Sequence, residues 1–428
     1  MKFDKIESKL LKETIMHGVH ESGLRVYIVP KSGFSKYYAI YGTEYGSIDT
    51  KLNVPDTNEV INLPDGIAHF LEHKLFEEED GGNAFDRFAL TGANSNAFTS
   101  FDITAYLFSC TDSFYENLDI LMDFVNHPYF TDENVAKEQG IIGQEIKMYD
   151  DDPSWRLFFN MLQAMYHNNP VKTDIAGTVE SIAKITPDIL FKCCDAFYNP
   201  SNMFLVMVGD IDADKAIEIV DKYVSADRDR GRIQRAKIDE PKSVVKSEIS
   251  QKMSVSKPQF MIGFKEQETD IEGSELLKKQ IETNVILNIL FGVSSKFFNE
   301  LYEEGLIDGS FGFEAELEKK YGFSSVNGES KDPKAVYDRV IKRINEVKQT
   351  GFDEAEVSRT KKVLIGANLK GYNDVERIGN NFIRSFMSGI NPFEYENIAQ
   401  NITKDSLEKR LHQHFNQDAA VLSVIEPL

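Results

Sequence analysis

Hydrophobic and polar residues alternate along the first half of the chain in two different periods. The two-residue period, with aromatic and aliphatic residues, predicts strands over residues 23–30, 37–45 and 95–108. The helical period predicts helices over residues 85–90, 115–126 and 133–149. Strands and helices alternate, but hairpin-like runs of strands also occur. We therefore predict the α+β fold class with a largely antiparallel sheet.

A further helix is predicted after a loop that contains Pro55 and Pro64. Asp65 precedes the helical stretch, and we expect its side chain to cap the first turn. The apolar face of this helix should anchor it in the core; it consists of Ile67, Phe70, Leu71 and Leu75.

The second half of the chain repeats part of the first. Residues 185–208 align without gaps on residues 402–425, and both begin with Ile-Thr-x-Asp and end in a β-rich run. YFTDENVAKEQ and GFDEAEVSRTK form a second pair in the same order. Chance resemblance of generic helix–strand units is the alternative. The repeat favours a duplicated α/β module, with domains at 1–224 and 258–428 joined by a charged linker over 225–257.

The composition limits the classes of partner. The 428 residues carry a formal net charge of −21, and lysine and arginine form no stripe for nucleic acid or an anionic membrane. The N-terminus lacks a signal peptide's apolar core, and no apolar run approaches the roughly 20 residues of a membrane span. Cys110, Cys193 and Cys194 fit reduced thiols better than disulfides. We expect a cytoplasmic protein that binds neither nucleic acid nor membrane.

HFLEH, residues 69–73, is the strongest chemical signal in the sequence. His69, Glu72 and His73 share one face of a helix, because positions i, i+3 and i+4 lie together at 3.6 residues per turn. Two imidazoles one turn apart can hold one Zn²⁺ at about 2.0–2.1 Å each. The alternative is a polar helix face with two solvated histidines.

A catalytic zinc needs a third protein ligand and an open position for water. The richest source is EQGIIGQEIKMYDDDP, in which Glu138 and Glu145 lie seven residues apart and therefore on one helix face. A solvated acidic helix is the alternative for this segment.

HFLEH, followed after some seventy residues by E-x6-E, resembles the inverted-motif zinc peptidases of the insulinase and pitrilysin family, which includes mitochondrial processing peptidase. Within that family the sequence resembles above all the half-length bacterial zinc-bearing subgroup, the YmfH-like proteins. Residues 91–106, TGANSNAFTSFDITAY, also resemble the substrate-pairing strand of that family. The resemblance implies two homologous modules, each a mostly antiparallel sheet packed with helices, that form half of a clamshell chamber.

The same resemblance implies roles for individual residues. One Zn²⁺ per chain would be held by His69, His73 and Glu145. Glu72 would be the general base, which takes a proton from water and passes it to the leaving amine, and Glu138 would orient a histidine ligand. Asn96 and Ala97 would bind a peptide that lies as an added strand along a sheet edge. For Asn96, an ordinary strand or turn residue is the alternative.

The sequence departs from the family at LYEEGLIDGS, residues 301–310. Active members carry an arginine and a tyrosine there, which face the zinc of the partner half; this chain has Tyr302 and Asp308 instead. Neither can take over the role, because an acid disfavours developing negative charge and tyrosine lacks the cationic fork. We therefore expect a heterodimer with a homologous half-length chain that supplies the pair, with a homodimer as the rival.

These observations predict a zinc endopeptidase that hydrolyses peptides or unfolded segments inside a closed chamber. A non-catalytic peptide-binding or assembly subunit of the same fold is the alternative. The other close histidine pairs, His17 with His20 and His412 with His414, lack the glutamate that lies between the two histidines of HFLEH, and they are expected at the surface.

Overall fold

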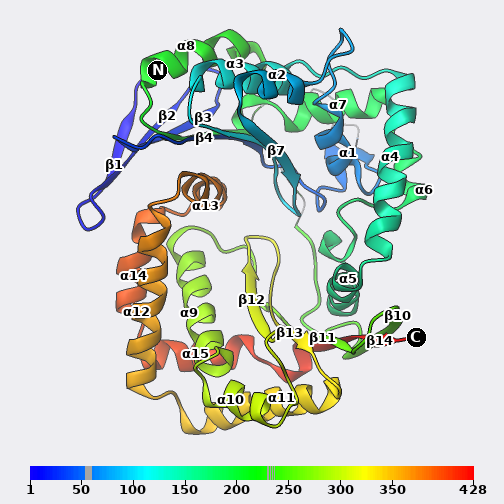
Figure 1. Ribbon diagram of the computed structural model, residues 1–428, viewed down its shortest axis with the longest axis vertical. Coiled ribbons are helices and arrows are strands. Elements are labelled where there is room, and N and C mark those ends of the chain that lie inside the picture. The colour runs from blue at the N-terminus through cyan, green and yellow to red at the C-terminus, as the bar shows by residue number, and fades with distance from the viewer. Residues whose placement is uncertain (54–59, 229–230, 232, 234, 236) are drawn as a thin grey trace. The chain divides into compact units, whose positions relative to one another are not determined.

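The computed structural model describes residues 1–53, 60–228, 231, 233, 235 and 237–428, and within them the chain forms two compact units. Unit 1 consists of Met1–Ile146, Thr173–Lys237 and Lys370–Met387. Unit 2 consists of Lys147–Lys172, Ile238–Leu369 and Ser388–Leu428. Each unit is a β-sheet packed with helices, as the ribbons of Figure 1 show, so the predicted α+β fold class is confirmed.

Unit 1 contains a seven-stranded sheet in the order β1-β2-β3-β9-β4-β8-β7. Its strands are β1 (Asp4–Ser8), β2 (Glu13–Val19), β3 (Arg25–Pro30), β4 (Tyr37–Thr43), β7 (Asn94–Thr99), β8 (Thr104–Cys110) and β9 (Met203–Gly209). Among the described residues β3 and β9 are the parallel pair, and the other neighbours are antiparallel. A separate two-stranded ribbon joins β5 (Lys51–Asn53) to β6 (Val60–Asn62).

Helices cover both faces of the unit 1 sheet. The unit contains α1 (Ile67–Lys74), α2 (Ala84–Thr91), α3 (Phe114–Asn126), most of α4 (Asp132–Asp150), α6 (Val179–Ile182), α7 (Pro187–Phe197), α8 (Ala213–Tyr223) and α13 (Val375–Met387). Neighbouring residues of β4 show the two layers, because successive side chains of a strand point to opposite faces. Tyr37 meets Phe114 of α3, whereas the Tyr38 hydroxyl donates to Asn380 of α13 at 3.1 Å. The central strand β9 is consequently buried along its whole length.

Unit 2 contains a five-stranded sheet in the order β10-β14-β11-β13-β12. Its strands are β10 (Glu248–Met253), β11 (Gln259–Lys265), β12 (Gly312–Leu317), β13 (Gly322–Glu329) and β14 (Ala420–Pro427). Its helices are α5 (Pro153–Met165), α9 (Gly273–Phe291), α10 (Lys296–Glu303), α11 (Pro333–Thr350), α12 (Glu354–Gly371), α14 (Tyr395–Asn401) and α15 (Lys404–His414). Phenylalanine, leucine, isoleucine and valine side chains of α9, α11, α15 and the sheet form its core.

The two sheets share one strand order, which is the structural counterpart of the sequence repeat. β3-β9-β4-β8-β7 of unit 1 matches β10-β14-β11-β13-β12 of unit 2, including the single parallel pair among the described strands of each series. The long helix α4 follows β8 and α3 in the chain, and the long helix α12 follows β13 and α11, so the two helices have equivalent places in their modules. The prediction of two homologous modules, each a mostly antiparallel sheet packed with helices, is therefore confirmed.

The units interleave the two halves of the sequence. Helix α5 comes from the first half but packs on β11 and β14 of unit 2, whereas α13 comes from the second half but packs on β4 and β9 of unit 1. Part of the predicted linker forms strand β10. The division into 1–224, 225–257 and 258–428 stays a prediction about the duplicated sequence modules.

Two local predictions were wrong. The predicted strand over 95–108 is a hairpin of β7 and β8, since alternation continues through the tight turn, where Phe101 and Ile103 are buried. The cap of α1 is Gly66 with no side-chain hydrogen bond, and not Asp65. Pro55 of the predicted loop and positions 229, 230, 232, 234 and 236 of the predicted linker lie outside the described residues. A search of the described part of the chain finds no helix with the length and apolar character of a membrane span.

Candidate metal centre

Helix α1 is fixed at its start by a glycine. Gly66 has φ 89°, a left-handed conformation that side chains rarely adopt, and a Cβ there would lie 2.3 Å from the Ala176 carbonyl oxygen. The carbonyl of the preceding Asp65 accepts a hydrogen bond from the Ser181 hydroxyl at 2.7 Å. Ile67, Phe70 and Leu71 are buried beneath the helix. The polar face of α1 therefore has a defined position.

His69, His73 and Glu145 converge on one point. The two histidines lie one turn apart on α1, and Glu145 approaches from α4. Glu145 Oε1 lies 3.8 Å from His69 Nε2, and its Oε2 lies 3.5 Å from His73 Nε2. The three potential ligand atoms all lie within 4.8 Å of one another.

This geometry fits a zinc ion. Two ligands that each lie about 2.0–2.2 Å from a tetrahedral zinc are roughly 3.4 Å apart, which is close to the separations of both imidazoles from Glu145. Two imidazoles and one carboxylate are also a donor set that catalytic zinc uses, with a fourth position left open. The residues present could therefore hold the metal that the sequence pattern predicts.

A carboxylate behind His73 orients its ring. Glu138 is buried, and its Oε1 lies 3.1 Å from His73 Nδ1. Because a carboxylate accepts, Nδ1 carries the proton and Nε2 presents its lone pair toward Glu145. Lys74 is fully buried, lies 3.9 Å from the other Glu138 oxygen and pairs with Glu77. His69 lacks such support, since no described residue bonds to its buried Nδ1.

The two histidines differ in basicity. Burial, followed by the neighbouring His73, lowers the pKa of His69 to about 4. Burial alone would also lower the pKa of His73, but its hydrogen bond to Glu138 and the charges of Glu72 and Glu145 raise that pKa above its ordinary value. Without a cation, His73 is therefore the imidazole that takes up a proton first.

Glu72 lies on the same face of α1, between the two histidines in sequence. Its carboxylate accepts hydrogen bonds from the hydroxyl of Thr99 at 2.7 Å and from the Thr99 backbone N–H. Burial raises the pKa of Glu72, although these hydrogen bonds oppose the shift. A carboxylate with a raised pKa beside three potential metal ligands is suited to general-base chemistry.

Sequence reasoning missed Thr99 and Lys74. Thr99 belongs to the quoted strand, and alternation places it on the same face as Ala97, but its contact with Glu72 depends on how β7 packs against α1. Lys74 follows the second histidine directly, and a lysine in that position gives no sign in the sequence that it will be fully buried.

Asn96 and Ala97 lie on β7, which has a neighbouring strand on one side only within the described residues. Asn96 is exposed, and its side-chain oxygen accepts the Ala97 backbone N–H at 2.9 Å. That N–H therefore points away from β8, toward the open edge of the sheet. A peptide carbonyl could replace the Asn96 oxygen there.

Tyr302 and Asp308 belong to unit 2. Tyr302, on α10, is 54% exposed and stacks on Phe298. Asp308 pairs with Lys257, and this contact, with a further hydrogen bond from Ser310, lowers the pKa of Asp308 to about 2. Asp308 thus keeps its negative charge, and its local partner is a lysine of its own unit.

The surface prediction for the remaining histidines was wrong for two of them. His20 is buried and contacts Asp221 through Nε2 at 2.9 Å. His414 is fully buried, lies 2.7 Å from the Ser324 hydroxyl and 3.2 Å from Glu266. Both have partners far away in sequence, so a search for acids in helical register could not find them.

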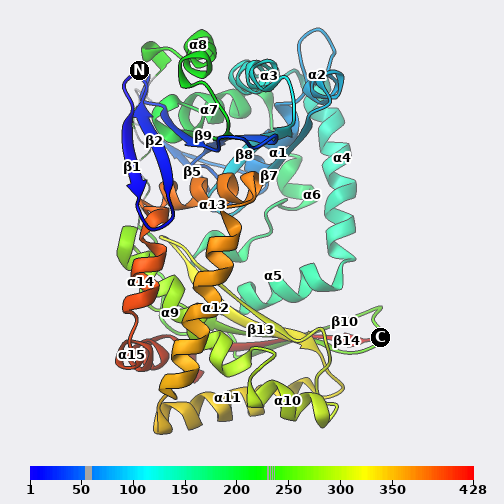
Figure 2. The ribbon, with the colours of Figure 1, turned by 60° about the vertical axis from the view of Figure 1, so that its left-hand side comes forward.

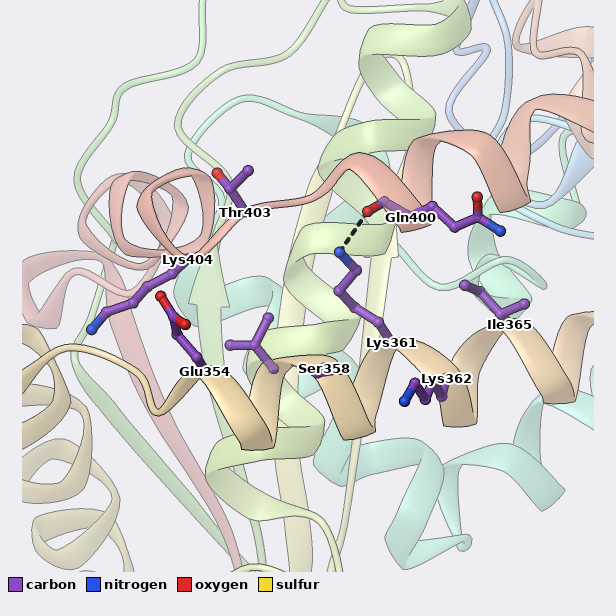
Figure 3. A pocket seen from close by; sticks show the side chains of 9 residues that line it. Glu354, Ser358, Lys361, Lys362, Ile365, Gln400, Thr403 and Lys404 are labelled. Carbon is purple, nitrogen blue, oxygen red and sulfur yellow. Dashed lines mark hydrogen bonds between the residues drawn. The ribbon is translucent and has the colours of Figure 1, made fainter.

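Unit 2 also has a groove of about 420 Å³ between α12 and the segment before α15. Figure 3 shows Lys361 of α12 reaching across to donate to the Gln400 carbonyl, at 2.7 Å. The side chains of Val357 and Ile365 line the groove, with Glu354 as its only carboxylate among the described lining residues. With no imidazole and one acid, this groove is not a second metal centre.

Two family descriptions match the sequence. "Insulinase (Peptidase family M16)" matches residues 61–179, and "Peptidase M16 inactive domain" matches residues 184–364. The uncharacterized zinc protease YmfH of Bacillus subtilis (strain 168) is 41% identical over 425 residues, which is 99% of each chain.

Solved structures agree with these matches. An M16-like peptidase from Alicyclobacillus acidocaldarius is 33% identical with a TM-score of 0.89, covering 100% of this chain and 99% of that one. The periplasmic protease PqqL of Escherichia coli is 18% identical with a TM-score of 0.76, and the match covers 99% of this chain but 48% of PqqL. The second likeness shows a shared fold, and this chain has about half the length of PqqL.

Proposed function

The chain belongs to the insulinase family, peptidase family M16, and on that premise we propose that it is a zinc-dependent endopeptidase. Its substrates would be peptides or unfolded segments that fit inside a closed chamber. The observation that carries the proposal is the position of Glu72, whose carboxylate lies on the face of α1 that also presents His69 and His73. A site that only held a metal would need no carboxylate there.

His69, His73 and Glu145 would hold one Zn²⁺ per chain. When bound, zinc supplies a Lewis acid that makes water more acidic and polarises a carbonyl group. Glu72 takes the proton of the attacking water and passes it to the nitrogen of the leaving amine as the peptide bond breaks. Glu138 keeps the proton of His73 on Nδ1, so that Nε2 remains a ligand.

The peptide would bind as an added strand along β7. The Ala97 N–H points to the open edge and would donate to a peptide carbonyl, while the Asn96 side chain, freed from that N–H, would bond to the peptide backbone. Thr99 links this strand directly to Glu72. A bound peptide would therefore lie next to the general base.

A dimer would complete the active site. The chain has about half the length of PqqL. Tyr302 lacks the cationic group of the arginine that it replaces, and Asp308 lacks the hydroxyl of the tyrosine that it replaces, so neither can take over that residue's role at a developing oxyanion. We propose a heterodimer with a homologous half-length chain that contributes an arginine and a tyrosine. A homodimer with weaker activity is the rival.

A cytoplasmic location is part of the proposal. Cys110, Cys193 and Cys194 are free thiols, and Cys110 and Cys193 are buried. Reduced cysteines are typical of the cytosol.

The alternative function is a peptide-binding or assembly subunit that turns over nothing. The departures at Tyr302 and Asp308 favour it, since they remove two groups on which active members depend. It predicts zinc and peptide binding without any product that depends on Glu72.

Comparing native protein with Glu72→Gln tests the two functions. Both proteins are loaded with zinc and incubated with unstructured peptides, alone and with any homologous half-length chain that co-purifies. We expect cleavage by the native protein and a loss of at least about 100-fold in Glu72→Gln, because a general base contributes about 10²–10⁴-fold. Glu133→Gln, at the exposed start of α4, is the control and should cleave normally.

Equal products from native protein and Glu72→Gln would contradict the peptidase. Cleavage at ordinary enzymatic rates by the native chain alone would contradict the requirement for a partner.

A further inference from the structure

Helix α13 is held firmly on the face of the unit 1 sheet opposite to α1, and Figure 2 shows it lying along the strands. Gly379 allows close approach, since a Cβ there would lie 2.3 Å from the Tyr38 ring. The next residue, Asn380, accepts from the Tyr38 hydroxyl, and Phe386 stacks on Tyr27 with ring centroids 3.7 Å apart. Contacts near both ends of α13 thus fix the residues between them.

Arg384 of α13 reaches the open edge strand. Its guanidinium carbon lies 5.6 Å from the ring centroid of Phe98 on β7, within the range of a cation–π contact. Phe98 is half-buried, and its neighbour Thr99 points to the opposite face, where it contacts Glu72. Glu72 therefore lies next to one face of the edge strand, and Arg384 lies next to the other.

Arg384 has no carboxylate partner among the described residues. The chain as a whole carries a net charge of −21. Arg384 also contrasts with Lys36, which pairs with Glu376 of the same helix at 2.7 Å. The planar guanidinium of Arg384, with its five N–H donors, therefore lies beside a sheet edge without an ion-pair partner among the described residues.

We infer that Arg384 and Phe98 form a side-chain subsite that selects an acidic residue of a peptide bound along β7. The inference rests on the proposed function, because it takes β7 as the strand that pairs with substrate. Alternate side chains of an added strand point to the α13 face, and one of them would lie next to Phe98 and Arg384. The ring packs against the methylene groups of a glutamate, and the guanidinium donates to its carboxylate.

The local arginine outweighs the overall negative charge of the chain at physiological salt. The Debye length is about 8 Å at 0.15 M ionic strength, so distant surface carboxylates are screened. A carboxylate in hydrogen-bond contact with Arg384 is screened much less. Selectivity for an acidic side chain should therefore persist at 0.15 M salt.

The test measures peptide binding by the full-length, zinc-loaded Glu72→Gln protein, so that the peptide is not cut. Fluorescein-labelled alanine–serine peptides carry a single Glu, Gln or Lys at successive positions, and fluorescence anisotropy gives Kd at 0.15 M salt. We expect the Glu peptide to bind about 3- to 10-fold more tightly than the Gln peptide at one or more positions that alternate along the strand.

Three further variants in the Glu72→Gln background locate the effect. Arg384→Gln should abolish the preference for Glu, and Arg384→Glu should reverse it in favour of Lys. Arg377→Gln is the matched control, because it removes the same charge from the same helix about 10.5 Å along the axis. It should leave the preference unchanged.

A preference that survives in Arg384→Gln, or an equal loss in Arg377→Gln, overturns the subsite. Failure of every peptide to bind overturns it as well. A failure of the peptidase function is a separate result: the native chain would then cleave nothing even together with a homologous half-length chain, while the Glu72→Gln protein still bound Glu peptides selectively through Arg384.

Discussion

The two modules differ at one equivalent place, just beyond the end of an inner strand. β4 ends at Thr43 opposite Met203, and Tyr45 follows; β11 has Phe264 opposite Ala420, and Glu266 follows. In unit 1 Tyr45 stacks on Phe197, with ring centroids 3.9 Å apart, and its hydroxyl lies 3.7 Å from Cys193 Sγ.

In unit 2 the three equivalent positions carry ionisable side chains. Glu266 pairs with Arg410 and lies 3.2 Å from His414, and the sequence repeat aligns these two residues with Cys193 and Phe197. Lys279 lies 3.3 Å from the other oxygen of Glu266. The same fold therefore accepts either an aromatic stack or a buried charge cluster between the sheet and the helix that precedes β9 or β14, which is α7 in unit 1 and α15 in unit 2.

At the positions of the proposed metal residues the difference is reversed, because here unit 1 carries the ionisable side chains. Aligning the first residues of α4 and α12 places Thr360 and Ala367 at the positions of Glu138 and Glu145. The cluster of potential metal ligands found in the described residues lies in unit 1.

Together these differences distinguish a structural charge cluster from a metal centre. In unit 2 the carboxylate of Glu266 is surrounded by cationic partners, so its charge is already balanced. In unit 1 two imidazole nitrogens face one carboxylate at 3.5–3.8 Å, which leaves space for a cation between them.

Removing one proposed ligand should have the largest effect. His73→Ala should weaken zinc binding by several orders of magnitude, because two ligands remain where zinc needs at least three. His412→Ala, an exposed histidine of unit 2, is the control and should bind zinc like the native chain. Competition with a chelator measures both affinities, and equal values would contradict the site.

Changing the buried histidine of unit 2 should alter the pH dependence of stability. Burial, followed by Arg410, lowers the pKa of His414 from 6.5 to about 4. Between these values the unfolded chain takes up a proton that the folded chain refuses, so stability falls as pH falls, by about 3 kcal/mol. Burial raises the pKa of Glu266, but the contact with His414 and the charge and hydrogen bond of Arg410 outweigh it and hold that pKa well below its usual value, so the contribution of Glu266 is lost only below the ordinary carboxyl pKa.

His414→Phe copies Phe197 of unit 1 and should remove about one proton from the slope of unfolding free energy between pH 6.5 and 4. Urea unfolding at a series of pH values measures that slope. His414→Gln, which keeps a polar side chain, should show the same change of slope. An unchanged slope in both variants would mean that His414 does not carry the effect.

Glu138→Gln should have an intermediate effect. The residue contacts His73 rather than the metal, and loss of such a partner typically weakens metal affinity by about 10- to 100-fold. Thr360→Val changes the matching position of α12 and should leave zinc affinity unaltered. A loss as large as that of His73→Ala would indicate that Glu138 is itself a ligand.

The helix caps of the repeat should give the smallest effect. Thr403 begins α15 with a capping box in which Ser406 reciprocates, whereas Thr186 begins α7 with one bond at 3.4 Å. Thr403→Ala should cost about 1 kcal/mol of unfolding free energy in urea, and Thr186→Ala less. A larger cost at Thr186 would reverse this ranking of the caps.

Local patterns predicted much of the fold. The helical period over 133–149 corresponds to α4, and the apolar run that begins at Met203 forms the buried strand β9. HFLEH fixed the relative positions of His69 and His73, because both lie on one helix and need no other element. The roles of the site residues stay predictions.

Contacts between distant elements could not be predicted. Thr99 meets Glu72 only because β7 packs on α1, and His414 is buried only because Glu266 and Ser324 come from other elements. The sequence repeat also does not predict that α13 belongs to unit 1, and it therefore does not predict the contact between Arg384 and Phe98.

The zinc K-edge X-ray absorption spectrum of the zinc-loaded native chain tests the assigned metal centre most directly. One zinc per chain should show two imidazole nitrogens at about 2.0–2.1 Å and carboxylate oxygen at about 2.0–2.2 Å, without sulfur. A sulfur shell at about 2.3 Å, or a shell without imidazole, would contradict the assignment of His69, His73 and Glu145.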